Sequence, residues 1–222
     1  MILSRTGLRT FRASTSLHHL HGTSLASTRY FSITSPVATR ISELIKNDHR
    51  ELENAYNKIL SATNRDEQER WQNQFTWELA RHSIGEELVV YPSMEKHLNN
   101  GRVMADQDRQ EHQVVKEHLY EFQGLRPEEE AFIPTLKTLW GHLEQHIKEE
   151  ETNDLPSLEK TLDETESDQM AASFGRTKKF IPTRSHPSAP DKPPYETVAG
   201  LMSAPMDRLG DMLRKFPDEA RA

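Results

Sequence analysis

Apolar side chains recur every three or four residues along four stretches of the chain, residues 41–59, 71–89, 105–122 and 132–150. This period is that of an α-helix with one buried face. Short polar segments separate the stretches, so consecutive helices are expected to pack as antiparallel neighbours. The pattern predicts an all-α, up-down-up-down four-helix bundle over residues 37–163.

Three prolines mark expected helix boundaries. Pro127 precedes three glutamates, a composition typical of the first turn of a helix, so we expect the fourth helix to begin there. Pro92 and Pro156 each lie near the end of a helical stretch. Because proline lacks an amide hydrogen, they should end or kink the second and fourth helices.

Each predicted helix has one histidine within its apolar stripe, and two of the helices have a glutamate four residues after it. A spacing of four places the two side chains on the same helix face, one turn apart. Counting about 1.5 Å of helix per residue from the connecting turns brings the four histidines to roughly one layer of the bundle. The six residues are His49, His82, Glu86, His112, His146 and Glu150.

The two halves of the bundle repeat each other. Residues 79–98 align without a gap with residues 143–162 and are identical at nine of twenty positions. A weaker echo relates Asp48-His49 in the first half to Glu111-His112 in the second. Each half therefore supplies two histidines and one glutamate, as a two-metal site in a duplicated helical hairpin requires.

The chemistry of this set favours a pair of metal ions. Two buried glutamates facing each other are strongly disfavoured unless cations balance their charge. Four imidazoles and two carboxylates are too many ligands for one tetrahedral zinc, but they suit two six-coordinate irons bridged by the glutamates, with positions left open. The chain has no cysteine, which excludes thiolate ligands. We expect two iron ions, with manganese or zinc as alternatives; the competing interpretation is an ordinary amphipathic bundle with partly exposed His and Glu side chains.

Other residues near the stripes are weaker candidates. His142 lies one turn before His146 and is a candidate extra ligand or a partner of a ligand. Glu87 and Glu151 are expected to bond a ligand histidine or solvent rather than the metal, with Glu151 as a reserve ligand. His118 is expected at the surface.

Four segments of the chain, at Asp48-His49, residues 82–92, Glu111-His112 and residues 146–156, resemble the signature segments of the hemerythrin-like, or HHE cation-binding, family. The resemblance covers about residues 38–162. It implies a four-helix bundle with a non-haem di-iron centre. It assigns the ligand roles to His49, His82, Glu86, His112, His146 and Glu150.

One position departs from the oxygen-carrying members of that family. They have a His-x-x-x-His pair on the third helix, whereas here the residue four positions after His112 is Lys116. This difference weakens the interpretation as a reversible oxygen carrier. The chain resembles instead the branch with four histidines and two glutamates, which is associated with iron or oxygen sensing and nitric oxide chemistry.

The two ends of the chain differ from the bundle in composition. The first 42 residues contain five arginines, many serines and threonines, and no acidic residue. This is typical of a mitochondrial presequence, so residues 1–36 are predicted to be a transit peptide that directs the protein to the matrix. Residues 164–222 are predicted to form a tail that is extended and proline-rich over residues 180–194 and continues into a short amphipathic helix. This tail either packs on its own bundle or binds an unknown partner.

The net charge of −7 argues against a nucleic-acid binder. The sequence contains no run of about 18 apolar residues, so no transmembrane helix is predicted. The predicted function is a mitochondrial di-iron protein that binds or senses oxygen, nitric oxide or peroxide, or handles iron. One alternative is a di-iron oxidoreductase that reduces nitric oxide or peroxide. Another is a structural or adaptor bundle in which metal only stabilises the fold. No separate acid–base catalytic residue is identifiable.

Overall fold

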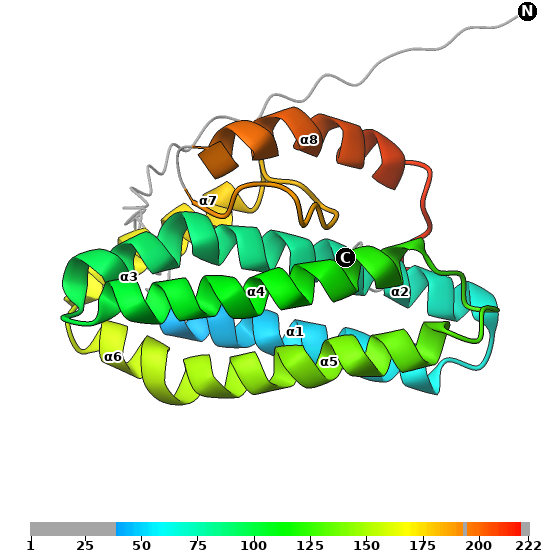
Figure 1. The fold of residues 1–222 in the computed structure, drawn as a ribbon, viewed down its shortest axis with the longest axis horizontal. Helices are drawn as coiled ribbons and strands as arrows, with labels where there is room; N and C mark the ends of the chain where they lie inside the picture. Colours follow the sequence, from blue (N-terminus) through cyan, green and yellow to red (C-terminus); the bar gives the residue numbers. More distant parts are fainter. Residues whose placement is uncertain (1–38, 193–194, 219–222) are drawn as a thin grey trace, which may run out of the picture. The chain divides into compact units, whose positions relative to one another are not determined.

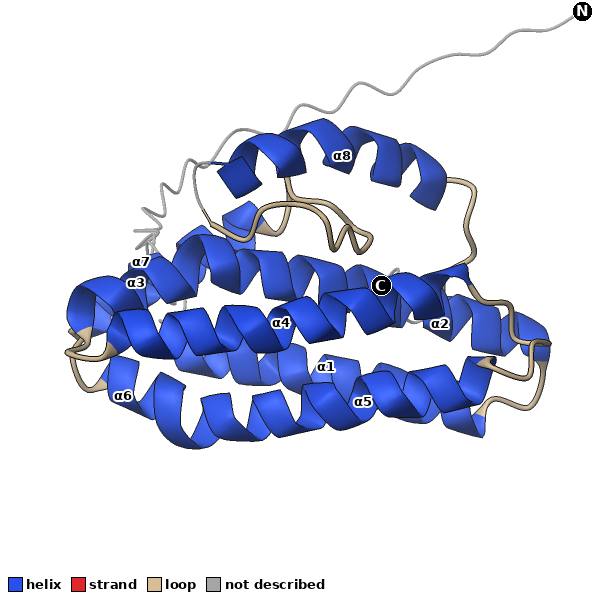
Figure 2. Cartoon of the chain, viewed as in Figure 1, coloured by secondary structure: helices blue, strands red, loops and turns tan. Residues whose placement is uncertain are grey.

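The computed structural model describes residues 39–192 and 195–218, and every regular element in these residues is helical (Figures 1 and 2). The predicted transit peptide, residues 1–36, lies outside the described residues. Among the helices that are described, none is long and apolar enough to cross a membrane.

Four long helices form the bundle: α1 (Ile41–Ser61), α2 (Arg65–Gly85), α4 (Gly101–Gly124) and α5 (Phe132–Glu149). Helix α1 packs along α2, and α4 packs along α5. Their apolar stripes meet in a core in which Phe75, Phe122 and Phe132 are fully buried. The predicted all-α bundle is confirmed.

The connections between the long helices are short. Asn64 caps α2 by accepting a hydrogen bond from the backbone N–H of Glu67 at 2.9 Å. Helix α4 starts at Gly101, where a Cβ atom would lie only 1.8 Å from the carbonyl oxygen of Met94. The turn before α4 therefore requires a glycine.

The fourth long helix begins later than the sequence predicts. Residues 125–131 form a loop, and α5 starts at Phe132 rather than at Pro127. A carboxylate oxygen of Glu129 accepts a hydrogen bond from the backbone N–H of Arg126 at 2.7 Å, and the amide of Gln72 donates to the carbonyl of Leu125 at 2.8 Å. These bonds hold the acidic segment as a turn, so the prediction of a helix start at Pro127 was wrong.

A π-helical turn follows each of α2 and α5. The first, η1 (Glu86–Val90), leads into α3 (Tyr91–His97), and the second, η2 (Glu150–Asp154), leads into α6 (Leu155–Glu159). Pro92 and Pro156 are the second residues of α3 and α6, so neither proline ends the helical segment in which it lies. Of the predicted end or kink, the end is thus wrong. A π turn shifts the backbone hydrogen-bond register by one residue, which accommodates a residue without an amide hydrogen at the point of the shift.

The tail contains one helix that the sequence pattern did not predict, α7 (Glu164–Thr177), and one that it did, α8 (Tyr195–Asp211). Helix α7 begins with a capping box, in which Asp163 and Glu166 each bond the other's backbone N–H. It packs against α1 and η1. The tail is therefore more helical than a proline-rich composition suggests.

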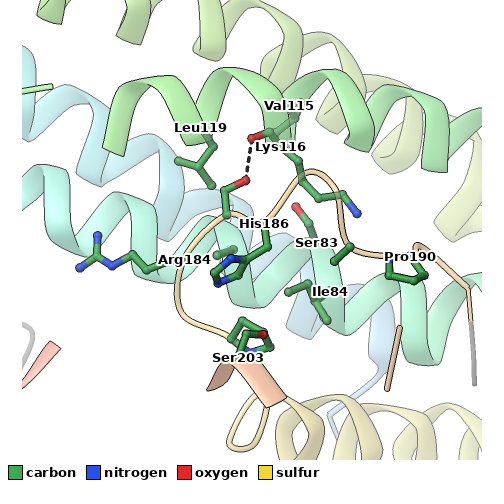
Figure 3. A pocket seen from close by; sticks show the side chains of 13 residues that line it. Ser83, Ile84, Val115, Lys116, Leu119, Arg184, His186, Pro190 and Ser203 are labelled. Carbon is green, nitrogen blue, oxygen red and sulfur yellow. Dashed lines mark hydrogen bonds between the residues drawn. The ribbon is translucent and has the colours of Figure 1, made fainter. Parts of the chain in front are cut away.

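Residues 178–192, which we call the strap, lie along α2 and α4 (Figure 1). Ser185 donates a hydrogen bond to the carbonyl of Lys116 at 2.6 Å, drawn in Figure 3, and Arg184 donates to the side chain of Asn73 at 3.1 Å. A mostly apolar cavity of about 30 Å³ lies between the strap and these two helices. The described tail residues thus contact their own bundle.

Candidate metal centre

Six buried side chains converge in the middle of the bundle, and they fall into two groups. Ligand atoms of one group lie within 4.8 Å of one another, and the same holds for the other group. The two groups share Glu86. The first consists of His49, His82, Glu86 and Glu150, and the second of Glu86, His112 and His146.

Each long helix supplies one histidine, and each π turn supplies one glutamate as its first residue. None of the six side chains is more than 1% exposed. The structure therefore brings together all six residues that the sequence singled out. From the sequence we expected both glutamates to bridge two ions. In the structure only Glu86 belongs to both groups, and Glu150 belongs to the first.

Within the first group the ligand atoms lie close together but do not form hydrogen bonds with one another. His82 Nε2 lies 3.3 Å from a carboxylate oxygen of Glu86, and His49 Nε2 lies 3.2 Å from one of Glu150. Both imidazole nitrogens and all four carboxylate oxygens are buried without a hydrogen-bond partner. Orphaned buried polar atoms are rare because each costs about 1–3 kcal/mol. A cation among them removes that cost, so this donor set fits bound metal ions.

A ring of carboxylates surrounds the histidines. Each histidine contacts a carboxylate through Nδ1, and these partners are Glu151 for His49 at 2.8 Å, Asp48 for His82 at 3.4 Å, Glu87 for His112 at 3.2 Å and Glu111 for His146 at 2.9 Å. A proton on Nδ1 leaves a lone pair on Nε2, the tautomer that a metal ligand needs. The lone pairs of His112 and His146 then face each other across 3.0 Å, an arrangement that a cation between them would stabilise.

Every outer carboxylate is the sequence neighbour of an inner ligand. Glu87 and Glu151 follow the two glutamates of the groups, and their predicted bonds to ligand histidines are confirmed. Asp48 and Glu111 precede His49 and His112, and the sequence pattern predicted no role for them. The weak repeat between these two acid-histidine pairs was the signal that could have identified them.

Two buried lysines pair with carboxylates of this ring. Lys116 Nζ lies 2.7 Å from Glu87, and Lys178, at the start of the strap, forms an ion pair with Asp48. Lys116 thus supports His112 through a carboxylate rather than facing the metal positions. Lys178 shows that the tail takes part in the site, which the sequence pattern gave no means to predict.

Helix α7 covers the site at His82. The ring of Phe174, which is fully buried, lies with its centroid 6.4 Å from that of His82. A Cβ atom at Gly85 would come within 2.8 Å of the Phe174 ring, so this glycine allows the close approach. The aromatic cover keeps the surroundings of His82 apolar.

Burial sets the protonation of the inner residues. It lowers the pKa of His82 to about 4 and that of His112 to about 4, so both imidazoles are neutral near pH 7, as metal ligands must be. Burial, together with the charge of Glu150, raises the pKa of Glu86 well above 4.5. A bound cation would reverse that rise by favouring the carboxylate.

Tyr91 is a further site residue, and sequence reasoning missed it. Its hydroxyl lies 3.0 Å from His112 Nε2, and its side chain is fully buried. Burial and the charge of Glu86 raise the pKa of Tyr91 well above 10, so it remains a phenol and a hydrogen-bond donor. The aligned position in the other repeat is Leu155, so the duplication gave no signal for it.

The weaker candidates lie outside the two groups. His142 stacks on His118 with ring centroids 5.1 Å apart and belongs to neither group, so the structure does not bring it together with the six inner residues. The reserve ligand Glu151 bonds His49 and also pairs with Arg50.

A helical bundle with two groups of histidine and glutamate donors that share a carboxylate is a cation-binding protein of the hemerythrin type. The sequence profile described as the hemerythrin HHE cation binding domain matches residues 40–158, and the chain belongs to this family. The family predicted from the sequence is thus confirmed.

Two known proteins extend the comparison. The chain is 59% identical over 180 residues to a hemerythrin-like protein of Schizosaccharomyces pombe, an alignment that covers 81% of this chain and 89% of that protein. A crystal structure of a hemerythrin HHE cation binding domain-containing protein from Mycobacterium kansasii superimposes with a TM-score of 0.55 and 20% identity, over 64% of this chain and 86% of that one. The second similarity supports the fold.

Proposed function

We propose that the six inner residues hold two iron ions, and that the protein binds or senses a small molecule such as oxygen, nitric oxide or peroxide at the open positions of the pair. The observation that carries this proposal is the pair of buried donor groups that share Glu86 and have orphaned atoms. Hard carboxylate oxygens with imidazole nitrogens favour iron or manganese over copper.

An unequal number of donors supports binding of an external ligand at one ion. The first group offers four residues and the second offers three. A six-coordinate ion in the second group would therefore keep more positions for solvent or a ligand. Tyr91 lies beside that group, and once a cation occupies His112 Nε2 the phenol can donate its hydrogen bond to a bound ligand.

Location in the mitochondrial matrix is a second part of the proposal. It rests on the basic, acid-free composition of the first 42 residues. A fusion of residues 1–40 to a fluorescent reporter tests it. A mitochondrial signal is expected, and a diffuse cytosolic signal would contradict it.

The test of the metal centre starts from the purified full-length chain. We expect two irons per chain by elemental analysis and a spin-coupled pair by Mössbauer spectroscopy; zinc, one metal ion or none would overturn the proposed di-iron function. Stopped-flow mixing of the anaerobically reduced protein with oxygen or nitric oxide then separates reversible binding from turnover. Reversible binding supports a sensor, whereas repeated consumption supports the oxidoreductase.

A Tyr91→Phe variant tests the position of the ligand. Iron content should stay at two per chain, because a phenol is not among the expected ligands. Dissociation of nitric oxide should accelerate about tenfold, the effect of losing one hydrogen bond of roughly 1.4 kcal/mol. Unchanged dissociation would place the ligand away from Tyr91.

A further inference from the structure

The duplicated site is not symmetric one turn beyond its ligands. In the first half Ile45 lies four residues before His49, and Val90 lies four residues after Glu86. Both are fully buried and belong to the apolar core.

The matching positions of the second half are Asp108, four residues before His112, and Asp154, four residues after Glu150. Asp108 is only 5% exposed and Asp154 only 8%. Neither carboxylate forms an ion pair with a lysine or arginine in residues 39–192 or 195–218. The fold thus accepts two costly buried acids at positions where its other half shows that hydrocarbon fits.

Geometry connects Asp108 to the metal centre, and charge connects Asp154 to it. Ligand atoms of Asp108, Glu111 and His146 lie within 4.8 Å of one another, a third group with the spacing of a cation site. Asp108 Oδ2 is buried and has no hydrogen-bond partner. Asp154 interacts electrostatically with both Glu111 and His146. This buried oxygen has no protein partner, so a bound cation would satisfy it.

Exposure falls stepwise along this group towards the centre. The Glu111 side chain is 29% exposed, Asp108 is 5% exposed and His146 is 1% exposed. Glu111 also contacts His146 Nδ1, while the opposite nitrogen of His146 faces the second metal position. A cation held by Glu111 and Asp108 would therefore stand one imidazole away from that position.

We propose that Asp108, Glu111 and Asp154 form a loading site that takes up a divalent cation, such as ferrous iron, and passes it to the position at His112 and His146. This inference rests on the proposed di-iron function and adds the route by which that centre fills. Oxygen donors without a histidine-rich shell bind such a cation weakly, which suits transfer rather than storage.

The chain offers a competing entrance at the other half of the site. A surface pocket of about 70 Å³ leads towards His49 between α1 and α5, and its lining includes Glu53 and Glu144. The matched control is therefore Glu53→Gln with Glu144→Gln, which removes two carboxylates from that mouth. The test variant is Asp108→Asn with Asp154→Asn, which removes two from the proposed loading site.

The experiment mixes the metal-free full-length protein with two equivalents of ferrous iron under anaerobic conditions. Ferrozine, added after increasing delays, reports the iron that the protein has not yet enclosed. We expect the Asp108→Asn/Asp154→Asn variant to enclose iron about tenfold more slowly than wild type, because it lacks two carboxylates that can bind the incoming ion, and to reach the same two irons per chain. The Glu53→Gln/Glu144→Gln control should keep the wild-type rate.

A second variant protects the test against a folding defect. Asp108→Ile with Asp154→Val copies the residues of the other half, and circular dichroism should show an intact bundle with the same slow loading. An unchanged rate in either Asp108/Asp154 variant, or a slow rate in the control alone, would overturn the loading site. If wild type encloses no iron at all, the proposed function itself fails, so the two failures are distinguishable.

Discussion

Replacing Glu86 by glutamine should change stability in opposite directions with and without metal. In the metal-free protein both Glu86 oxygens are fully buried without a hydrogen bond, and they lie near Glu150, which is in the same state. Glutamine keeps the size of the side chain, cannot ionise and can donate to Glu150. In the loaded protein the same substitution removes the one donor that belongs to both groups.

The magnitude follows from the cost of an orphaned buried acceptor, about 1–3 kcal/mol. The metal-free variant should therefore be more stable than the metal-free wild type by roughly that amount, which corresponds to about 2–12 °C in melting temperature for a chain of this size. Iron at a hundredfold excess over its dissociation constant should stabilise wild type by about 2.7 kcal/mol. The Glu86→Gln variant should gain little from iron.

The assay is urea unfolding of both proteins, once with a chelator and once with ferrous iron under anaerobic conditions. The control is Glu87→Gln, one residue further along. Glu87 pairs with the buried Lys116 and with His112, so its loss should destabilise the metal-free protein by about 3–5 kcal/mol. If metal-free Glu86→Gln is less stable than wild type, the reasoning that Glu86 is held for metal is refuted.

Three further outcomes are expected. The metal-free protein should lose stability as pH rises from about 4 to about 8. Burial raises the pKa of Asp108 to about 8, so the folded state keeps a proton that the unfolded chain releases. Urea unfolding at several pH values should show a flatter pH dependence of stability in Asp108→Asn. Phe174→Ala should cost about 3–5 kcal/mol of unfolding free energy, whereas Phe180→Ala, at a side chain that is 65% exposed, should change it by less than about 0.5 kcal/mol. Gly101→Ala should lower the melting temperature measured by circular dichroism, because its methyl group would overlap the Met94 carbonyl, and an unchanged value would show that the turn can relax.

The sequence predicted the inner site well because periodicity and duplication both report on it. A histidine within an apolar stripe can be read from spacing alone, and His49, His82, His112 and His146 all lie where the stripes place them. The outer partners Glu87 and Glu151 followed from their positions beside Glu86 and Glu150. Repetition thus supplied the ligands and half of their supporting carboxylates.

Features without a counterpart in the other repeat were missed. Tyr91 aligns with Leu155, and Asp108 corresponds to Ile45, so neither was marked by the duplication. The π turns escaped because a shift of one residue in the backbone register leaves the side-chain pattern almost unchanged. The ion pair between Lys178 and Asp48 joins residues 130 positions apart, a distance at which a helical pattern carries no information.

Lys178 also bears on where this protein's functional unit ends. The family profile stops at residue 158, yet the charge that balances Asp48 and the ring that covers His82 come from residues beyond that limit. A version trimmed to the profile would keep all six inner donors and still leave the Asp48 carboxylate without its cation. The segment matched by the family profile is therefore shorter than the segment that completes the electrostatic environment of the site. The tail contributes part of that environment.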